Sequence, residues 1–122
     1  MSKEWNPDTI FDIFASETAR NILALASMKP MSADELAQYC DTSKPTIYRR
    51  INVLLDHDFL TANDKNDRDG IQYRTFTTNL HRISFEINDG GIDTDLQLRH
   101  DLVDQFDGLW TDLQRETDTS DE

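Results

Sequence analysis

One stretch of this sequence carries basic residues and no acidic ones, in a chain that is otherwise strongly acidic. The full chain of 122 residues has 24 acidic and 12 basic residues and a formal net charge of −12. Residues 42–55 nevertheless contain Lys44, Arg49 and Arg50 without an Asp or Glu. A guanidinium group pairs bidentately with guanine, and the amide of an asparagine such as Asn52 pairs with adenine. The chemistry indicated is recognition of base edges and phosphates.

This stretch has the spacing of an amphipathic helix that would present its basic side chains outward. At ~100° per residue, Ile47, Ile51, Leu54 and Leu55 fall on one face, which we expect to pack on a core. Arg49 lies opposite that face, and Tyr48 and Arg50 flank it. The rest of the outward half is expected to comprise Pro45, Thr46, Asn52 and Val53.

We expect Arg49 and Asn52 to read bases, while polar and basic side chains near the helix N-terminus contact phosphates. Lys65 and Arg68, in a later polar turn, would reach the flanking groove or backbone. The predicted DNA-contact set is Ser43, Lys44, Pro45, Thr46, Tyr48, Arg49, Arg50, Asn52, Lys65 and Arg68. The alternative is that Arg49 and Arg50 pair with neighbouring Asp residues on a solvated surface.

Helix signals precede this stretch. Asn6-Pro7 is typical of a helix start, Ser16 starts a second helix, and Lys29-Pro30 is expected to end it. Ser32 and Glu35 form a Ser-x-x-Glu capping box for a short third helix that includes Cys40. Thr42 or Ser43 would cap the fourth helix, over about 44–57.

The pattern then changes to strands. Residues 59–63 and 71–77 read as a hairpin around the polar segment 64–70, and residues 83–87 and 92–98 read as a second hairpin. An apolar stripe follows at helical spacing. We interpret it as a dimerisation helix whose interface residues are Leu98, Leu102, Phe106, Leu109, Trp110 and Leu113. Covering its own core is the alternative role for this helix.

The order of elements is that of a winged helix-turn-helix. Between Met31 and Leu60 the chain resembles the ArsR-type transcriptional regulators, through Ser32 with Glu35-Leu36-Ala37, the run 43–49 (SKPTIYR), Leu54-Leu55 and Phe59-Leu60. The resemblance spans residues 9–76. It implies an α+β fold: a winged helix-turn-helix DNA-binding domain (1–78), to which we add a β-hairpin extension (79–98), a C-terminal dimerisation helix (99–115) and a disordered acidic tail (116–122).

Composition excludes several classes of protein. The single cysteine, Cys40, rules out a disulfide framework. The thiol metal sensors of the ArsR family carry paired cysteines near this point, so we expect a structural thiol, with redox or metal sensing as the alternative. Asp56-His57-Asp58 is expected to be an exposed helix end rather than a metal cluster. We find no catalytic motif, cofactor site, metal spacing or membrane span, and predict a cytoplasmic protein that is not an enzyme.

The acid is mostly aspartate: 18 Asp against 6 Glu, with 4 Lys. This bias resembles the proteins of salt-in halophilic archaea; an ordinary acidic protein is the alternative. The leading interpretation is a homodimeric, sequence-specific regulator of transcription, acting as a repressor on double-stranded DNA in a high-salt cytoplasm. The sequence names no effector ligand. The alternative is a winged-helix module that binds a protein in a transcription or replication complex.

Overall fold

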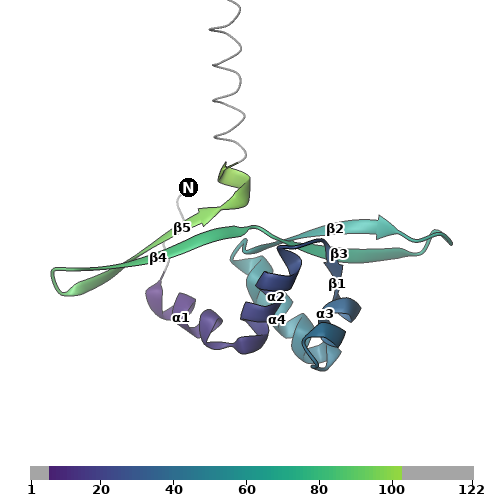
Figure 1. Ribbon diagram of the computed structural model, residues 1–122, viewed down its shortest axis with the longest axis horizontal. Coiled ribbons are helices and arrows are strands. Elements are labelled where there is room, and N and C mark those ends of the chain that lie inside the picture. Colours follow the sequence, from purple (N-terminus) through teal and green to yellow (C-terminus); the bar gives the residue numbers. More distant parts are fainter. Residues whose placement is uncertain (1–5, 103–122) are drawn as a thin grey trace, which may run out of the picture.

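The computed structural model describes residues 6–102, and most of the expected C-terminal helix and the whole tail lie outside the described residues. The elements run α1 (Pro7–Ala15), α2 (Glu17–Ala26), β1 (Met31–Ser32), α3 (Ala33–Tyr39), α4 (Lys44–Asp56), β2 (Leu60–Asn66), β3 (Gln72–Thr78), β4 (Leu80–Asn88) and β5 (Gly91–Leu98). Residues 99–102 are helical. In Figure 1 the β2–β3 and β4–β5 hairpins point in opposite directions above the helices. The predicted mixed α+β class is confirmed.

The helices begin at the side-chain caps that the sequence predicts. The carboxamide oxygen of Asn6 accepts from the Asp8 N–H (3.0 Å), and the Ser16 hydroxyl accepts from the Ala19 N–H (3.2 Å). Each such cap satisfies an N–H that the first helical turn leaves unpaired. Before α4 the cap is Ser43 rather than Thr42.

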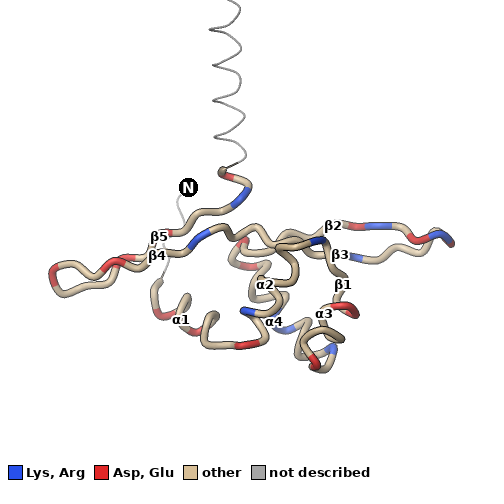
Figure 2. The backbone as a smooth tube through the Cα atoms, in the orientation of Figure 1, with Lys and Arg blue, Asp and Glu red and all other residues tan. Residues whose placement is uncertain are grey.

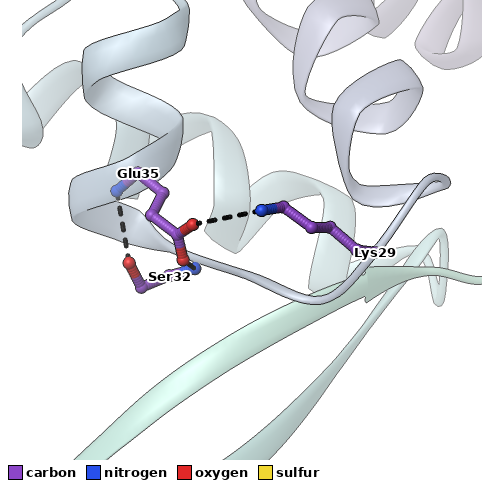
Figure 3. Close-up of polar contacts among 3 residues, drawn as sticks. All are labelled: Lys29, Ser32 and Glu35. Atoms are coloured by element: carbon purple, nitrogen blue, oxygen red, sulfur yellow. Dashed lines mark hydrogen bonds and ion pairs between the residues drawn. The ribbon is translucent and has the colours of Figure 1, made fainter.

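The predicted capping box of α3 is present. The Ser32 hydroxyl accepts from the Glu35 N–H (3.2 Å), and the Glu35 carboxylate accepts from the Ser32 N–H (3.1 Å) (Figure 3). Lys29 lies 3.9 Å from the other oxygen of the same carboxylate. These contacts fix where the chain turns from β1 into α3, one of the two helices of the predicted DNA-binding pair.

The core draws apolar side chains from every helix and from the first sheet. The largest fully buried side chains are Ile10, Ile22, Met31, Leu36, Ile47, Ile51, Leu54 and Phe59. Burying one such side chain contributes about 1.5–3 kcal/mol. The core therefore holds α4 by one face and leaves its opposite face to solvent.

The first sheet has the antiparallel order β1-β3-β2. Strand β1 is absent from the sequence prediction, because a two-residue strand leaves no periodic signal; its Met31 pairs with Phe76 and is buried. Strand β2 extends to Asn66, beyond the predicted end at residue 63, so the turn at the hairpin tip is shorter than expected. The reason is Asp67, whose carboxylate accepts from the N–H groups of Asp69 and Ile71, both at 2.9 Å, and closes the turn there.

Helix α2 ends at Ala26, earlier than the predicted stop at Lys29-Pro30. The Ser27 hydroxyl donates to the Ala24 carbonyl (2.6 Å), and the Met28 N–H donates to the Leu25 carbonyl (3.1 Å). These contacts replace the regular helical ladder before the proline is reached. Within residues 6–102 no helix is long and apolar enough to cross a membrane.

The second sheet is the antiparallel β4–β5 hairpin. Its turn has positive φ at Asp89 (43°) and Gly90 (87°), as the tight turns of two-residue hairpins require. Ile83 pairs with Leu96 and Ile87 with Ile92, so the apolar residues share one face. Leu98, predicted on the dimerisation helix, is the last residue of β5 and packs partly buried against the core of its own chain. Because Leu98 pairs with Leu80, the strand predicted over residues 92–98 is confirmed to its last residue, and the place of Leu98 in the dimer interface stays a prediction.

Asn79 joins the two sheets. Its backbone N–H donates to the Phe59 carbonyl (2.8 Å), and its carbonyl accepts from the Arg99 N–H. Its side-chain amide donates to the Asp58 carbonyl (2.8 Å) and accepts from the His100 N–H (3.1 Å). One buried residue thus links the end of α4, the start of β2 and the segment after β5.

Candidate nucleic-acid interface

A tight turn joins α3 to α4 and fixes the angle between them. Asp41 adopts a left-handed conformation (φ 50°), and the Thr42 N–H donates to the Ala37 carbonyl (3.1 Å). A left-handed residue after a helix is the usual way to end it, and aspartate tolerates that conformation better than most residues. The Ser43 hydroxyl then accepts from the Thr46 N–H and starts α4.

The surface of α4 away from the core presents the residues expected to read bases. Pro45, Arg49 and Asn52 are exposed, and the Tyr48 side chain is 48% exposed. Arg50 and Thr46 are half-buried at the margin. Val53, predicted on the outward half, instead packs partly buried against the core. The predicted outward position of Val53 is wrong, because α4 contacts α2, α3 and β2 together. The buried sector of α4 is therefore wider than the stripe of four residues predicted from the sequence.

The basic residues of α4 differ in their partners. The Lys44 ammonium lies 2.5 Å from the carboxylate of Asp34 on α3, and that hydrogen bond raises the pKa of Lys44. Within residues 6–102, by contrast, neither Arg49 nor Arg50 forms an ion pair or a side-chain hydrogen bond. The alternative that Arg49 and Arg50 pair with neighbouring Asp residues is therefore not what the described residues show, and their guanidinium groups are available to an external anion.

The Ser43 hydroxyl is engaged inside the helix. It donates to the Thr46 hydroxyl (3.1 Å) while it accepts from the Thr46 N–H (3.4 Å). Its proton is therefore directed at Thr46 in this structure. Ser43 has an evident role in starting α4, in addition to the phosphate contact expected from the sequence.

The β2–β3 hairpin carries charges of both signs near its tip (Figure 2). Lys65 lies on β2 opposite Tyr73, and Arg68 lies in the turn; both are exposed. Two of the acidic residues beside them, Asp64 and Asp67, have partners within the hairpin. Asp67 accepts two backbone N–H groups, and Asp64 lies 3.3 Å from Arg74. Lys65 and Arg68 form no ion pair with the described residues.

Arg74 belongs to this surface although sequence reasoning did not select it. A hollow of about 270 Å³ separates α4 from β3, and Arg74 lines it together with Tyr48 and Asn52. The signal was the alternation of β3, which places Arg74 on the same strand face as the buried Phe76. Arg74 was not predicted because only the apolar residues of β3 were considered.

The expected dimer interface is only partly within the described residues. Leu98 ends β5, and Leu102 is half-buried in the short helical segment 99–102. The other predicted interface residues lie outside the described residues: Phe106, Leu109, Trp110 and Leu113.

The candidates for other chemistry have structural settings. Cys40 is half-buried at the end of α3, and burial raises the pKa of its thiol. His57 caps the C-terminus of α4, with Nδ1 2.8 Å from the Val53 carbonyl. No group of three potential metal ligands occurs among residues 6–102.

Comparison with known families bears on α3 and α4 directly. Residues 14–62 match the family described as a helix-turn-helix domain. The match runs from the end of α1 to the first residues of β2, so it includes the exposed face of α4 but ends before Lys65, Arg68 and Arg74. Thus the helix-turn-helix predicted from the sequence is confirmed.

A solved structure is also similar to the chain: the crystal structure of an ArsR family transcriptional regulator. It shares 25% sequence identity, with a TM-score of 0.47, over 62% of this chain and 76% of that chain. No curated protein matches the sequence.

Proposed function

We propose that the protein is a sequence-specific DNA-binding regulator of transcription, of the ArsR type that the sequence resembles. One observation carries the proposal. On the helix-turn-helix domain, the exposed face of α4 presents arginines without an acidic partner among residues 6–102, in a chain with net charge −12. A cationic face whose arginines have no acidic partner among the described residues suits a polyanion.

In this proposal α4 lies in the major groove. Arg49 donates two hydrogen bonds to a guanine, and Asn52 pairs with an adenine. Tyr48 and Arg50 contact phosphates on either side. Arg74 approaches the same backbone from the β3 side of the hollow, and Lys65 and Arg68 follow the flanking groove.

We further propose that the protein acts as a homodimeric repressor in a high-salt cytoplasm. Helix-turn-helix regulators read paired half-sites as dimers, which matches the two-fold symmetry of an inverted repeat. In molar salt the Debye length is only ~3 Å, so the repulsion between DNA and the acidic residues is screened. The same salt weakens ordinary phosphate contacts, so base readout and shape carry more of the affinity.

Cations bridging carboxylates to phosphates would offset part of that loss. We therefore expect operator affinity to fall little as KCl increases, or to rise. A steep negative slope of the logarithm of affinity against the logarithm of salt concentration, of the ordinary kind, would contradict the bridging.

The deciding experiment compares the tagged wild-type protein with Arg49→Ala by genome-wide crosslinking and sequencing in its own host. Arg82→Ala is the matched control, because Arg82 is an exposed arginine on β4, away from α4. We expect sharp peaks over an inverted repeat for the wild type and the control, and their loss in Arg49→Ala. On that repeat in vitro, Arg49→Ala should weaken binding by about 1–3 kcal/mol.

The second candidate function is a protein-binding module. The exposed apolar end of the β4–β5 hairpin favours it, with Ile87 80% exposed. Broad or absent peaks in all three strains would support this function and contradict the regulator. Affinity capture would then have to recover the same partner with wild type and Arg49→Ala.

A further inference from the structure

The outer half of the β4–β5 hairpin has an apolar face that the described residues leave uncovered. Phe85 is 41% exposed, Ile92 43% and Ile87 80%. Ile87 pairs directly with Ile92, and Phe85 stacks on Phe11 of α1 with ring centroids 4.7 Å apart. Phe11 is itself 43% exposed and completes this surface, which we call the hairpin patch: Phe11, Phe85, Ile87 and Ile92.

The hairpin patch is sharply distinguished from its surroundings. Nearer the base, Ile83 and Leu96 continue the same face and pack against the core. The opposite face of the outer hairpin is polar: Ser84, Glu86, Asp93 and Asp95. A two-stranded hairpin is marginally stable by itself, and clustered exposed apolar side chains mark contact surfaces. This alternation suits a strand pair with one face covered along its whole length.

The chain also has apolar residues that lie outside the described structure. After Leu102 the sequence places Phe106, Leu109, Trp110 and Leu113 at spacings of three and four. In a helical form, residues 103–113 would measure ~16 Å, and the strand from Ile83 to Ile87 measures ~13 Å. The two apolar surfaces are therefore similar in length.

The two apolar surfaces could pair within one chain or between two copies of it. The position where the described chain ends decides between these two arrangements. The Arg99 N–H donates to the Asn79 carbonyl, which holds residues 99–102 at the base of the hairpin. In Figure 1 this segment leaves on the side of the hairpin opposite α1. The hairpin patch lies on the α1 side, because Phe85 stacks on Phe11. The last described residues, 99–102, therefore lie on the side of the hairpin away from the hairpin patch.

We propose that residues 103–113 of one copy cover the hairpin patch of a second copy, and that the exchange is reciprocal. Reciprocal exchange of identical elements closes a two-fold dimer. The inference rests on the homodimer of the proposed function and assigns its interface. Residues 103–113 and the hairpin are both acidic, so salt tightens this dimer by screening their repulsion.

Photo-crosslinking of the full-length chain in 2 M KCl tests the exchange. Benzoylphenylalanine replaces Ile87 in one sample and, as the control, Ser84 on the opposite face in another. We expect a dimer-mass product only from position 87, with the crosslink mapped by mass spectrometry to residues 103–113. A monomer-mass crosslink to those residues, a dimer-mass crosslink to another segment, or no crosslink would overturn the exchange.

Two substitutions provide an equilibrium test by analytical ultracentrifugation. Ile87→Asp should raise the dimer dissociation constant by at least about tenfold, while Ser84→Asp, which adds the same charge to the same strand, should change it by less than about threefold. Unchanged circular dichroism would show that the exposed Ile87 site tolerates the change. Equal effects of the two substitutions would contradict the proposal.

Failure of this inference is distinguishable from failure of the proposed function. Arg49→Ala should weaken operator binding and leave the crosslink at position 87 intact. A normal crosslink with DNA binding that does not depend on Arg49 would refute the regulator and keep the dimer. A wild-type monomer that binds DNA through Arg49 would refute the dimer interface and keep DNA recognition.

Discussion

Replacing Asn79 with alanine should destabilise the protein through the junction between its two sheets. The Asn79 side chain is 8% exposed and makes two hydrogen bonds, to the Asp58 carbonyl and from the His100 N–H. The orientation of its amide is fixed by chemistry, since a carbonyl must meet the NH₂ group and an N–H must meet the oxygen. Alanine removes both bonds and leaves the backbone contacts of residue 79 in place.

The expected loss follows from the two bonds. Each contributes a net ~1 kcal/mol, and more where the remaining partner stays shielded from water. We therefore expect Asn79→Ala to lower the free energy of unfolding by about 2 kcal/mol, which corresponds to a fall in Tm of roughly 10 °C for a domain of this size. Asn79→Asp retains an acceptor for His100 but removes the donor to Asp58, so we expect it to be destabilised as well.

Urea unfolding followed by circular dichroism measures this difference. The control is Asn88→Ala, which removes an exposed 3.3 Å hydrogen bond to Asp93 at the hairpin end and should cost less than about 0.5 kcal/mol. If Asn79→Ala costs no more than Asn88→Ala, then the junction does not hold the two sheets together and the reasoning is refuted.

Three further changes test other parts of the structure. Thr94→Val should raise the free energy of unfolding by about 1 kcal/mol, because the buried Thr94 hydroxyl has no hydrogen-bond partner among residues 6–102. Thr77→Val, at a half-buried site, is the comparison, and a lower free energy of unfolding for Thr94→Val would contradict this. Ser32→Ala should lower the free energy of unfolding by about 1 kcal/mol, because it removes the α3 capping box. Ser84→Ala, at an exposed position on β4, is the control, and an equal loss there would argue against a specific cap. Burial raises the pKa of the Cys40 thiol above its usual 9.0, so the thiol is protonated at pH 7. We expect alkylation of Cys40 to accelerate only as the pH rises through the raised pKa, and rapid alkylation at pH 7 would refute this.

The elements of the site could be read from the sequence because their signals are local. A serine cap joins its hydroxyl to an N–H three residues later, so Ser16 and Ser32 could be assigned without a structure. The two faces of α4 follow from the helical period, and Ile47, Ile51 and Leu54 are buried as predicted. The alternation of Ile83, Phe85 and Ile87 likewise predicted the second hairpin, which is present as β4 and β5.

Contacts between distant parts of the chain were decided only by the tertiary structure. Packing placed Arg74 beside Asn52, brought Asp34 to Lys44, and buried part of Val53 under neighbouring elements. Asn79 gave no signal in the sequence, although it joins the two sheets. The physical reason is that local period and capping depend on residues within a few positions of each other, whereas these contacts depend on how whole elements pack. The sequence therefore determined which surface is basic and which helix carries it, and the fold decided which of its charges are already paired.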